Sequence, residues 1–214
     1  MQNPFSIEFN DLPKSLPVFP LPSVLLLPGG RLPLNIFEPR YLAMINYAFK
    51  HDKLIGMIQP KSSDSKELYK TGCIGKITNY NETDDNRYVI NLKGISKFKI
   101  INEIKHNEEF RVFKVEIEES KIHFDKFDKN LFMKEKFIEK IMFFLDKKGL
   151  SINLKSLEKI KDQSLIVTIA MICPFSTNEK QVLLESKNIN DLANNILSLL
   201  EFEINQKDNH ETIN

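Results

Sequence analysis

Apolar and polar residues follow two different periods along the chain, and the change falls near residue 120. Up to about residue 118, short apolar segments are separated by polar stretches, which is typical of strands joined by turns. Beyond it, apolar residues recur with a period of 3.6, which is typical of helices. The expected strands of the first part are 54–58, 73–77, 88–92, 98–104 and 112–117. The pattern predicts an α+β protein with a β-rich part at 1–118, a helical part at 119–206 and a disordered tail at 207–214.

Prolines interrupt the first third of the chain, at seven positions between Pro13 and Pro39. Proline cannot donate a hydrogen bond within a sheet, so this region is expected to form short strands linked by tight turns, one of them at Gly29-Gly30. Pro39 suits the first position of a helix. The apolar residues that follow it at helical spacing predict an amphipathic helix over 39–50: Tyr41, Leu42, Ile45, Ala48 and Phe49.

The polar segment 78–87 is interpreted as a hairpin connection, and 62–66 as a mobile loop. Alternation is imperfect over 88–92, which favours burial of both faces of that strand in a barrel-like sheet. We therefore expect a small, closed or half-closed β-domain with one packed helix.

Four or five helices are expected in the second half. One apolar stripe, from Phe137 to Leu145, ends at Gly149, and a shorter one covers 154–160. The segment 165–173 is apolar on nearly all sides, which predicts a buried central helix stopped by Pro174.

Two helix starts are predicted near the C-terminus. Ser176 and Glu179 have the spacing of a capping box. Asn190 is the expected N-cap of the last helix, in which Leu192, Ile196, Leu199 and Leu200 form the apolar stripe.

Charge and composition exclude several classes of protein. Thirty basic and 29 acidic residues among 214 leave a formal net charge of +1, which argues against a strongly cationic nucleic-acid binder. The N-terminus shows no secretory signal, and the longest apolar run is about half of the roughly 18 residues that span a membrane. Cys73 and Cys173 each lie in an apolar run and are expected to be buried free thiols. A soluble cytoplasmic protein is expected.

Motifs for common cofactor and metal chemistry are missing from the sequence. It contains no phosphate loop, no nucleophile elbow, no H-E-x-x-H, no C-x-x-C and no dinucleotide fingerprint. An ATP-driven machine is therefore excluded, and no cofactor is expected. A metal site is not expected either, because the four histidines lie far apart without ligand spacing: His51, His106, His123 and His210.

Residues 16–47 carry a specific pattern. Leu-Pro-Val-Phe-Pro-Leu at 16–21 is followed by Pro-Gly-Gly at 28–30 and by Pro-Leu-Asn-Ile-Phe-Glu-Pro-Arg-Tyr at 33–41. This order closely resembles the N-terminal substrate-binding domain of the ATP-dependent Lon protease, with L-P-x-x-P-L, a proline-glycine turn and P-L-x-I-F-E-P-R-Y. Further matches cover roughly 12–204. Tyr69 to Gly75 fits a strand entrance of the family. Leu92 to Phe98 fits its L-x-G-x-x-R-F turn, with Lys97 in place of Arg. Lys180 to Glu185 fits its K-Q-x-L-L-E segment.

The resemblance implies a PUA-like β pseudo-barrel followed by a helical bundle, in agreement with the change of period. The ATPase and protease modules of a full Lon protease are not found in the sequence, so the chain resembles the stand-alone, bacterial-type members of the family. The resemblance implies a non-catalytic module that binds unfolded or extended polypeptides in protein quality control. A separate ATP-dependent protease is a further expected partner, and no membrane or nucleic-acid partner is expected.

Candidate binding residues follow from two motifs. Glu38, Arg40 and Tyr41 belong to the most specific part of the resemblance, although helix-start chemistry also explains them: Glu38 places negative charge at the positive end of the helix, and Arg40 is suited to pair with it. Phe124 and Phe127, with Phe132, are expected either to form an aromatic patch for unfolded segments or to pack between domains. Two alternatives stay open: an RNA-binding PUA-like module, and a thiol hydrolase using Cys73 or Cys173 with a histidine.

Overall fold

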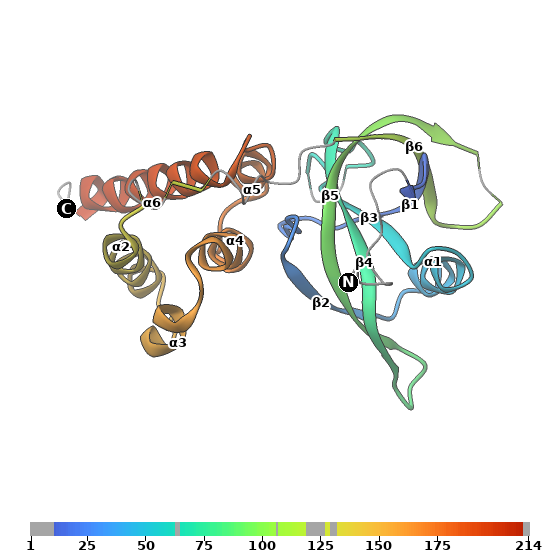
Figure 1. Ribbon diagram of the computed structural model, residues 1–214, viewed down its shortest axis with the longest axis horizontal. Coiled ribbons are helices and arrows are strands. Elements are labelled where there is room, and N and C mark those ends of the chain that lie inside the picture. The colour runs from blue at the N-terminus through green and yellow to red at the C-terminus, as the bar shows by residue number, and fades with distance from the viewer. Residues whose placement is uncertain (1–10, 63–64, 106, 119–126, 129–131, 212–214) are drawn as a thin grey trace. The chain divides into compact units, whose positions relative to one another are not determined.

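A computed structural model describes residues 11–62, 65–105, 107–118, 127–128 and 132–211. Figure 1 shows strands together with a helix in the first part of the chain, and helices in the second. The chain divides into two compact units, Met1–Lys121 and Ile122–Asn214. The predicted boundary at residue 118 and the predicted tail from residue 207 stay predictions.

The first unit is a six-stranded mixed sheet that closes on itself. Its strands are β1 (Ser15–Pro20), β2 (Arg31–Ile36), β3 (Leu54–Ile58), β4 (Thr71–Glu82), β5 (Tyr88–Ile104) and β6 (Arg111–Ile117). Within the order β2-β5-β4-β3-β1-β6, β6 also pairs with β5 and so closes a barrel of five strands. β2 pairs with the first half of β5 and stands at the end of the sheet. The expected barrel-like domain is confirmed.

The barrel interior is filled by apolar side chains from every strand of the closed sheet. Phe98 lies fully buried among them, with Leu16 and Val18 from β1, Ile74 from β4 and Phe113 from β6. Burial of such side chains contributes roughly 1.5–3 kcal/mol each to folding.

β5 corrects three expectations. The segments 88–92 and 98–104 were predicted as separate strands, and the family motif at 92–98 as a turn, but one strand of 17 residues runs through all of them. The register with β4 shifts between Ile74 and Gly75, which lie opposite Ser96 and Gly94. Ile95 is therefore the extra residue of a bulge, which bends a strand without ending it. The predicted burial of both faces over 88–92 is also wrong, because Ile90 and Leu92 are buried whereas Val89 and Asn91 are exposed.

Helix α1 (Pro39–Phe49) confirms the helix predicted over 39–50, with proline in its first turn. Its buried face consists of Tyr41, Met44, Ile45 and Ala48. The chain leaves the helix at His51, whose Nδ1 lies 2.7 Å from the Tyr47 carbonyl oxygen in the last turn.

The second unit contains five helices within its described part: α2 (Lys134–Lys147), α3 (Leu154–Lys159), α4 (Asp162–Ile172), α5 (Thr177–Leu184) and α6 (Ile189–Glu211). α6 packs against α2, α4 and α5. α4 buries five residues, Leu165, Ile166, Val167, Ile169 and Ala170, as the apolar run predicts. Its last residue, Ile172, is 50% exposed, so the burial predicted over 165–173 is incomplete.

The two predicted helix starts have different outcomes. The capping box at α5 is confirmed: the Glu179 N–H donates to Ser176 Oγ at 3.3 Å, and the Ser176 N–H donates to Glu179 Oε2 at 2.7 Å. The prediction of Asn190 as the N-cap of α6 is wrong. Asn188 caps the helix by accepting the Asp191 N–H at 2.9 Å, while Asn190 Oδ1 accepts the Asp128 N–H at 3.3 Å.

Candidate functional site

The helix-start motif forms one connected group at the beginning of α1. Arg40 Nε donates to Glu38 Oε2 at 3.0 Å, and Arg40 Nη2 lies 2.8 Å from the same oxygen. The Arg40 guanidinium also lies 4.5 Å from the centre of the Tyr41 ring. Tyr41 is buried, and its ring centre lies 4.1 Å from that of Phe19 on β1. The structure therefore brings Glu38, Arg40 and Tyr41 together.

This geometry gives each residue of the motif a role at the strand-to-helix junction. Glu38 is the N-cap of α1, but its side chain makes no capping hydrogen bond. Its carboxylate holds Arg40 instead, and the Arg40 guanidinium lies over the buried Tyr41 ring. Burial raises the pKa of the Tyr41 hydroxyl, so this side chain stays neutral at physiological pH. The side chain of Arg40 stays 51% exposed and can contact a ligand.

The second predicted group centres on aromatic residues of the helical unit. The ring centres of Phe127 and Phe132 lie 5.5 Å apart, and those of Phe132 and Phe137 lie 5.1 Å apart. Phe137 is buried in α2, whereas Phe127 and Phe132 are half-buried. Phe124 lies outside the described residues. Phe127 thus joins an aromatic row that ends in the core of the unit.

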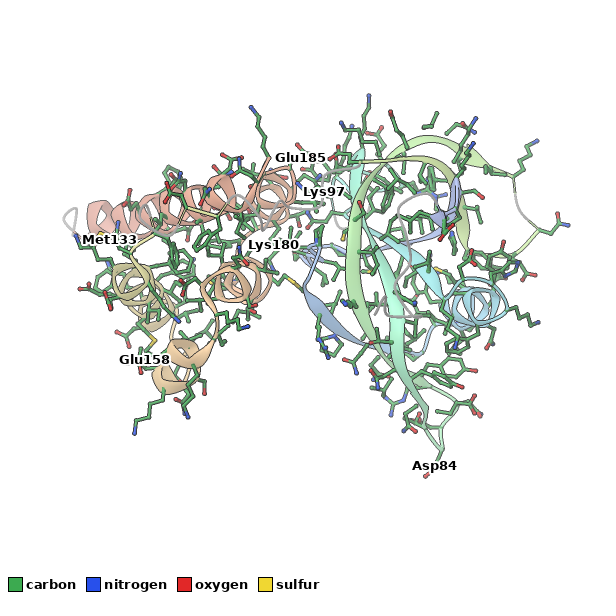
Figure 2. The ribbon with its side chains drawn as sticks, viewed as in Figure 1. Asp84, Lys97, Met133, Glu158, Lys180 and Glu185 are labelled. Atoms are coloured by element: carbon green, nitrogen blue, oxygen red, sulfur yellow. The ribbon has the colours of Figure 1, made fainter. Side chains whose placement is uncertain are left out.

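The row borders a hollow of about 210 Å³ between α2 and α6. Phe137 and Ala193 are its buried residues, and Met133, which is labelled in Figure 2, lines it with 55% of its surface exposed. The residues lining the hollow are Phe132, Met133, Lys136, Phe137, Lys140, Asn190, Ala193, Asn194 and Leu197. Pockets for drug-sized ligands measure roughly 300–1,000 Å³, so this hollow fits a single side chain better than a cofactor.

Most of this lining was not predicted from the sequence. The apolar stripe assigned to the last helix contained Leu192, Ile196, Leu199 and Leu200, which leaves out Ala193 and Leu197. These two residues are spaced i, i+4 and form a second apolar stripe beside the first. That spacing was a signal of a further apolar surface. Met133 gave no such signal, because it precedes α2 and belongs to no helical stripe.

Both thiols are free and buried, as predicted. Burial raises the pKa of Cys73 and of Cys173 to about 12. A cysteine nucleophile needs a lowered pKa, so these environments do not suit a thiol hydrolase. Within the part of the chain that the structure describes, no group of three or more His, Cys, Asp or Glu residues is arranged to hold a metal ion. Among the same residues, no helix is long and apolar enough to cross a membrane.

Comparison with known families is decisive for the identity of the domain. Residues 15–201 match the family model of the ATP-dependent protease La (Lon) substrate-binding domain. The chain belongs to this family. This match confirms, over most of the chain, the resemblance that the sequence motifs indicated.

Curated relatives of this Lon substrate-binding domain are Lon proteases. Lon protease 1 of Hydrogenovibrio crunogenus is 29% identical over 205 residues, which cover 92% of this chain and 25% of the relative. The Lon protease of Buchnera aphidicola is 27% identical over 207 residues, covering 89% of this chain and 25% of the relative. The chain thus spans about a quarter of the length of these relatives.

Solved structures agree with the fold of the Lon substrate-binding domain. A Lon N-terminal domain protein from Xanthomonas campestris has a TM-score of 0.62 at 20% identity and covers 86% of this chain and 97% of its own. The N-terminal domain of a Mycobacterium avium complex Lon protease has a TM-score of 0.61 at 15% identity, covering 88% and 98%. The predicted fold class, a β pseudo-barrel followed by a helical bundle, is confirmed.

Proposed function

We propose that this domain binds unfolded or extended polypeptide segments and holds one apolar side chain of the segment in the hollow between α2 and α6. The observation that carries the proposal is the lining of the hollow, in which five apolar residues, among them two phenylalanines and an exposed methionine, stand beside two lysines and two asparagines. Unfolded chains expose apolar side chains that folded proteins bury, so such a hollow distinguishes the two states. Binding a flexible segment costs ordering entropy, and the expected affinity is modest.

On this proposal, the domain binds polypeptides and does not catalyse a reaction. It acts in the cytoplasm as an accessory of protein quality control. A separate ATP-dependent protease is the proposed recipient of the bound polypeptide. The support for this step is the family itself, whose model describes the substrate-binding part of Lon.

The first experiment compares two states of one model protein. A fluorescent, reduced and alkylated protein that stays unfolded is titrated with the domain, and the native form of the same protein serves as the control. Fluorescence anisotropy is expected to report saturable binding of the unfolded form only. Equal, negligible binding to both forms would remove the proposed function.

The second experiment locates the binding. Met133→Lys replaces an exposed apolar side chain of the lining with a third lysine and is expected to weaken binding about tenfold, because the apolar contact of Met133 with the bound side chain is lost. Val182→Lys is the matched control, because Val182 lies on α5, is 51% exposed and is not among the residues that line the hollow. An equal loss of affinity in both variants would contradict binding at the hollow.

Glu38, Arg40, Tyr41, Phe124 and Phe127 remain the proposed contact residues outside the hollow lining. Arg40→Ala separates two roles, because it removes both the ion pair with Glu38 and the contact with the Tyr41 ring. A lower melting temperature with unchanged polypeptide affinity would assign Arg40 to the junction alone. Unchanged stability with lost affinity would assign it to the ligand.

A further inference from the structure

Three cationic side chains lie side by side where β2, β5 and β4 pair. Lys93 on β5 is the register partner of Arg31 on β2 and of Lys76 on β4. Directly paired residues of antiparallel strands place their side chains on the same face. Arg31 and Lys93 are exposed, and Lys76 is half-buried. We call these three residues the cationic row.

The next two rows along β2 on the same face carry no negative charge. The first consists of Pro33, Asn91 and Asn79, and the second of Asn35, Val89 and Asn81. The nine positions of the three rows thus hold three cations, four asparagines and no acid. Like charges directly opposite each other destabilise a sheet. A negatively charged ligand relieves this repulsion, so the face favours an anion.

The adjacent edge of β2 has backbone groups that the sheet does not use. Among the described residues, β2 pairs only with β5. The Gly94 N–H donates to the Gly30 carbonyl at 2.9 Å, so these two residues form a hydrogen-bonded pair. Along an antiparallel ladder, hydrogen-bonded pairs alternate with pairs that are not hydrogen-bonded. Leu32, Leu34 and Ile36 accordingly direct their backbone groups toward β5. Arg31 and Asn35 direct their N–H and C=O groups outward, where an added strand would lie, whereas Pro33 between them has no N–H and offers only its C=O.

We propose that the edge of β2 accepts an extended polypeptide segment whose aspartate or glutamate residues continue the cationic row. This inference rests on the proposed function and names a substrate class for it. A strand added beside β2 places a residue opposite Arg31, with its side chain on the face of the row. Because side chains alternate in direction, an acid at every second position meets this face. Main-chain hydrogen bonds hold the segment, and charge selects it.

A polypeptide fits this face better than a single-stranded nucleic acid. Proteins that bind single strands without sequence preference stack bases on aromatic side chains. The nine positions of the three rows include no aromatic residue, whereas the outward-facing backbone groups of β2 suit a peptide backbone.

The test uses the full chain and three fluorescent peptides that differ only at every second position, with Asp, Asn or Lys there. The wild-type protein is expected to bind the Asp peptide about fivefold more tightly than the Asn peptide, the effect of two or three exposed ion pairs. The variant Arg31→Glu/Lys93→Glu is expected to prefer the Lys peptide. Far-UV circular dichroism checks that this variant folds. The milder variant Arg31→Gln/Lys93→Gln is expected to lose the preference for the Asp peptide without reversing it.

Two controls separate strand addition from general electrostatics. Lys114→Glu/Lys155→Glu changes the net charge by the same amount at exposed positions on β6 and α3, and it is expected to keep the preference for Asp. An Asp peptide that is N-methylated at every second residue, on the side that faces β2, loses its main-chain donors and is expected to lose binding. Loss of the preference in the control variant, or full binding of the methylated peptide, would overturn the proposal.

The remaining outcomes distinguish this inference from the proposed function. If the unfolded model protein binds while the three peptides bind equally, the acidic substrate class is wrong and the proposed function stands. If no polypeptide binds, both fall. If an unstructured oligothymidylate displaces the Asp peptide and loses affinity in Arg31→Glu/Lys93→Glu, the face binds nucleic acid and the polypeptide assignment is overturned.

Discussion

The guanidinium of Arg111 holds the carboxylate of Glu103 with two parallel hydrogen bonds across the β5–β6 pair. Arg111 Nε donates to Glu103 Oε1 at 2.8 Å, and Nη2 donates to Oε2 at 2.7 Å. The third nitrogen, Nη1, donates to the Lys66 carbonyl at 2.8 Å. Arg111 thus ties the end of the barrel to the segment that precedes β4, with geometry that favours a strong ion pair.

This ion pair predicts a pH-dependent component of stability. The hydrogen bonds from Arg111 lower the pKa of Glu103 below its ordinary value of 4.5. The stabilisation is therefore complete above that value and is lost as the pH falls through the lower pKa of the folded state. Because the Glu103 side chain is 46% exposed, screening reduces its contribution to about 0.5 kcal/mol.

Glu103→Gln is expected to reduce the free energy of unfolding at pH 7 and to lose less stability than the wild type on acidification to about pH 3. Urea unfolding at both pH values measures the difference. Glu116→Gln, at an exposed position of β6, is the control. A constant difference between Glu103→Gln and the wild type across this range would contradict the role of the pair.

Gly94 and Gly75 are register partners on β5 and β4, yet they tolerate a side chain differently. A Cβ on Gly94 would lie 2.0 Å from the Leu27 carbonyl oxygen, which is backbone and cannot move aside. A Cβ on Gly75 would meet the flexible side chains of Leu26 and Leu92 at 3.0–3.3 Å. Gly94→Ala is expected to destabilise the protein by more than about 3 kcal/mol, and Gly75→Ala by about 1 kcal/mol. Equal midpoints of urea unfolding for the two variants would show that the 27–28 segment adapts.

The buried thiols predict a measurable protection. With a pKa of about 12 for Cys73 and Cys173, a fraction on the order of 10⁻⁴ is thiolate at pH 8. We expect negligible reaction of the native protein with an aromatic disulfide reagent and rapid reaction of both thiols in urea. The variants Cys73→Ala and Cys173→Ala assign the signals. Fast labelling of either cysteine in native buffer would mean that its surroundings open without global unfolding.

Local signals predicted the elements that neighbouring residues determine. Pro39 with the apolar stripe after it was sufficient for α1, and Ser176 with Glu179 for the start of α5. The failure at Asn190 has the same local origin. Asn188 also precedes the helix, and Asp191 favours the earlier start because its carboxylate accepts the Lys187 N–H at 2.8 Å while its own N–H reaches Asn188.

The candidate surfaces depend on long-range pairing that periodicity does not contain. The cationic row exists because Lys93 lies opposite both Arg31 and Lys76, and the register of β4 with β5 follows from shifts at Ile74/Gly75 and Ile77/Asn79. A one-residue slip would place these side chains on the other face. The hollow likewise needs the packing of α2 on α6, which brings Met133 beside Ala193 and Leu197.

Pro33 lies in the middle of the outward-facing positions of β2, between Arg31 and Asn35. Proline has no N–H, so this edge lacks its central donor, a feature that discourages pairing between sheet edges. Pro33→Val restores the donor and adds a β-branched residue, and it is expected to self-associate through β2. Sedimentation velocity should show an average mass that rises with protein concentration more than for the wild type. Asn35→Val is the control, because it adds an apolar side chain to the same edge without a new donor. Equal association of both variants would attribute the effect to hydrophobicity, and no association of Pro33→Val would mean that the edge of β2 is not accessible to a second strand.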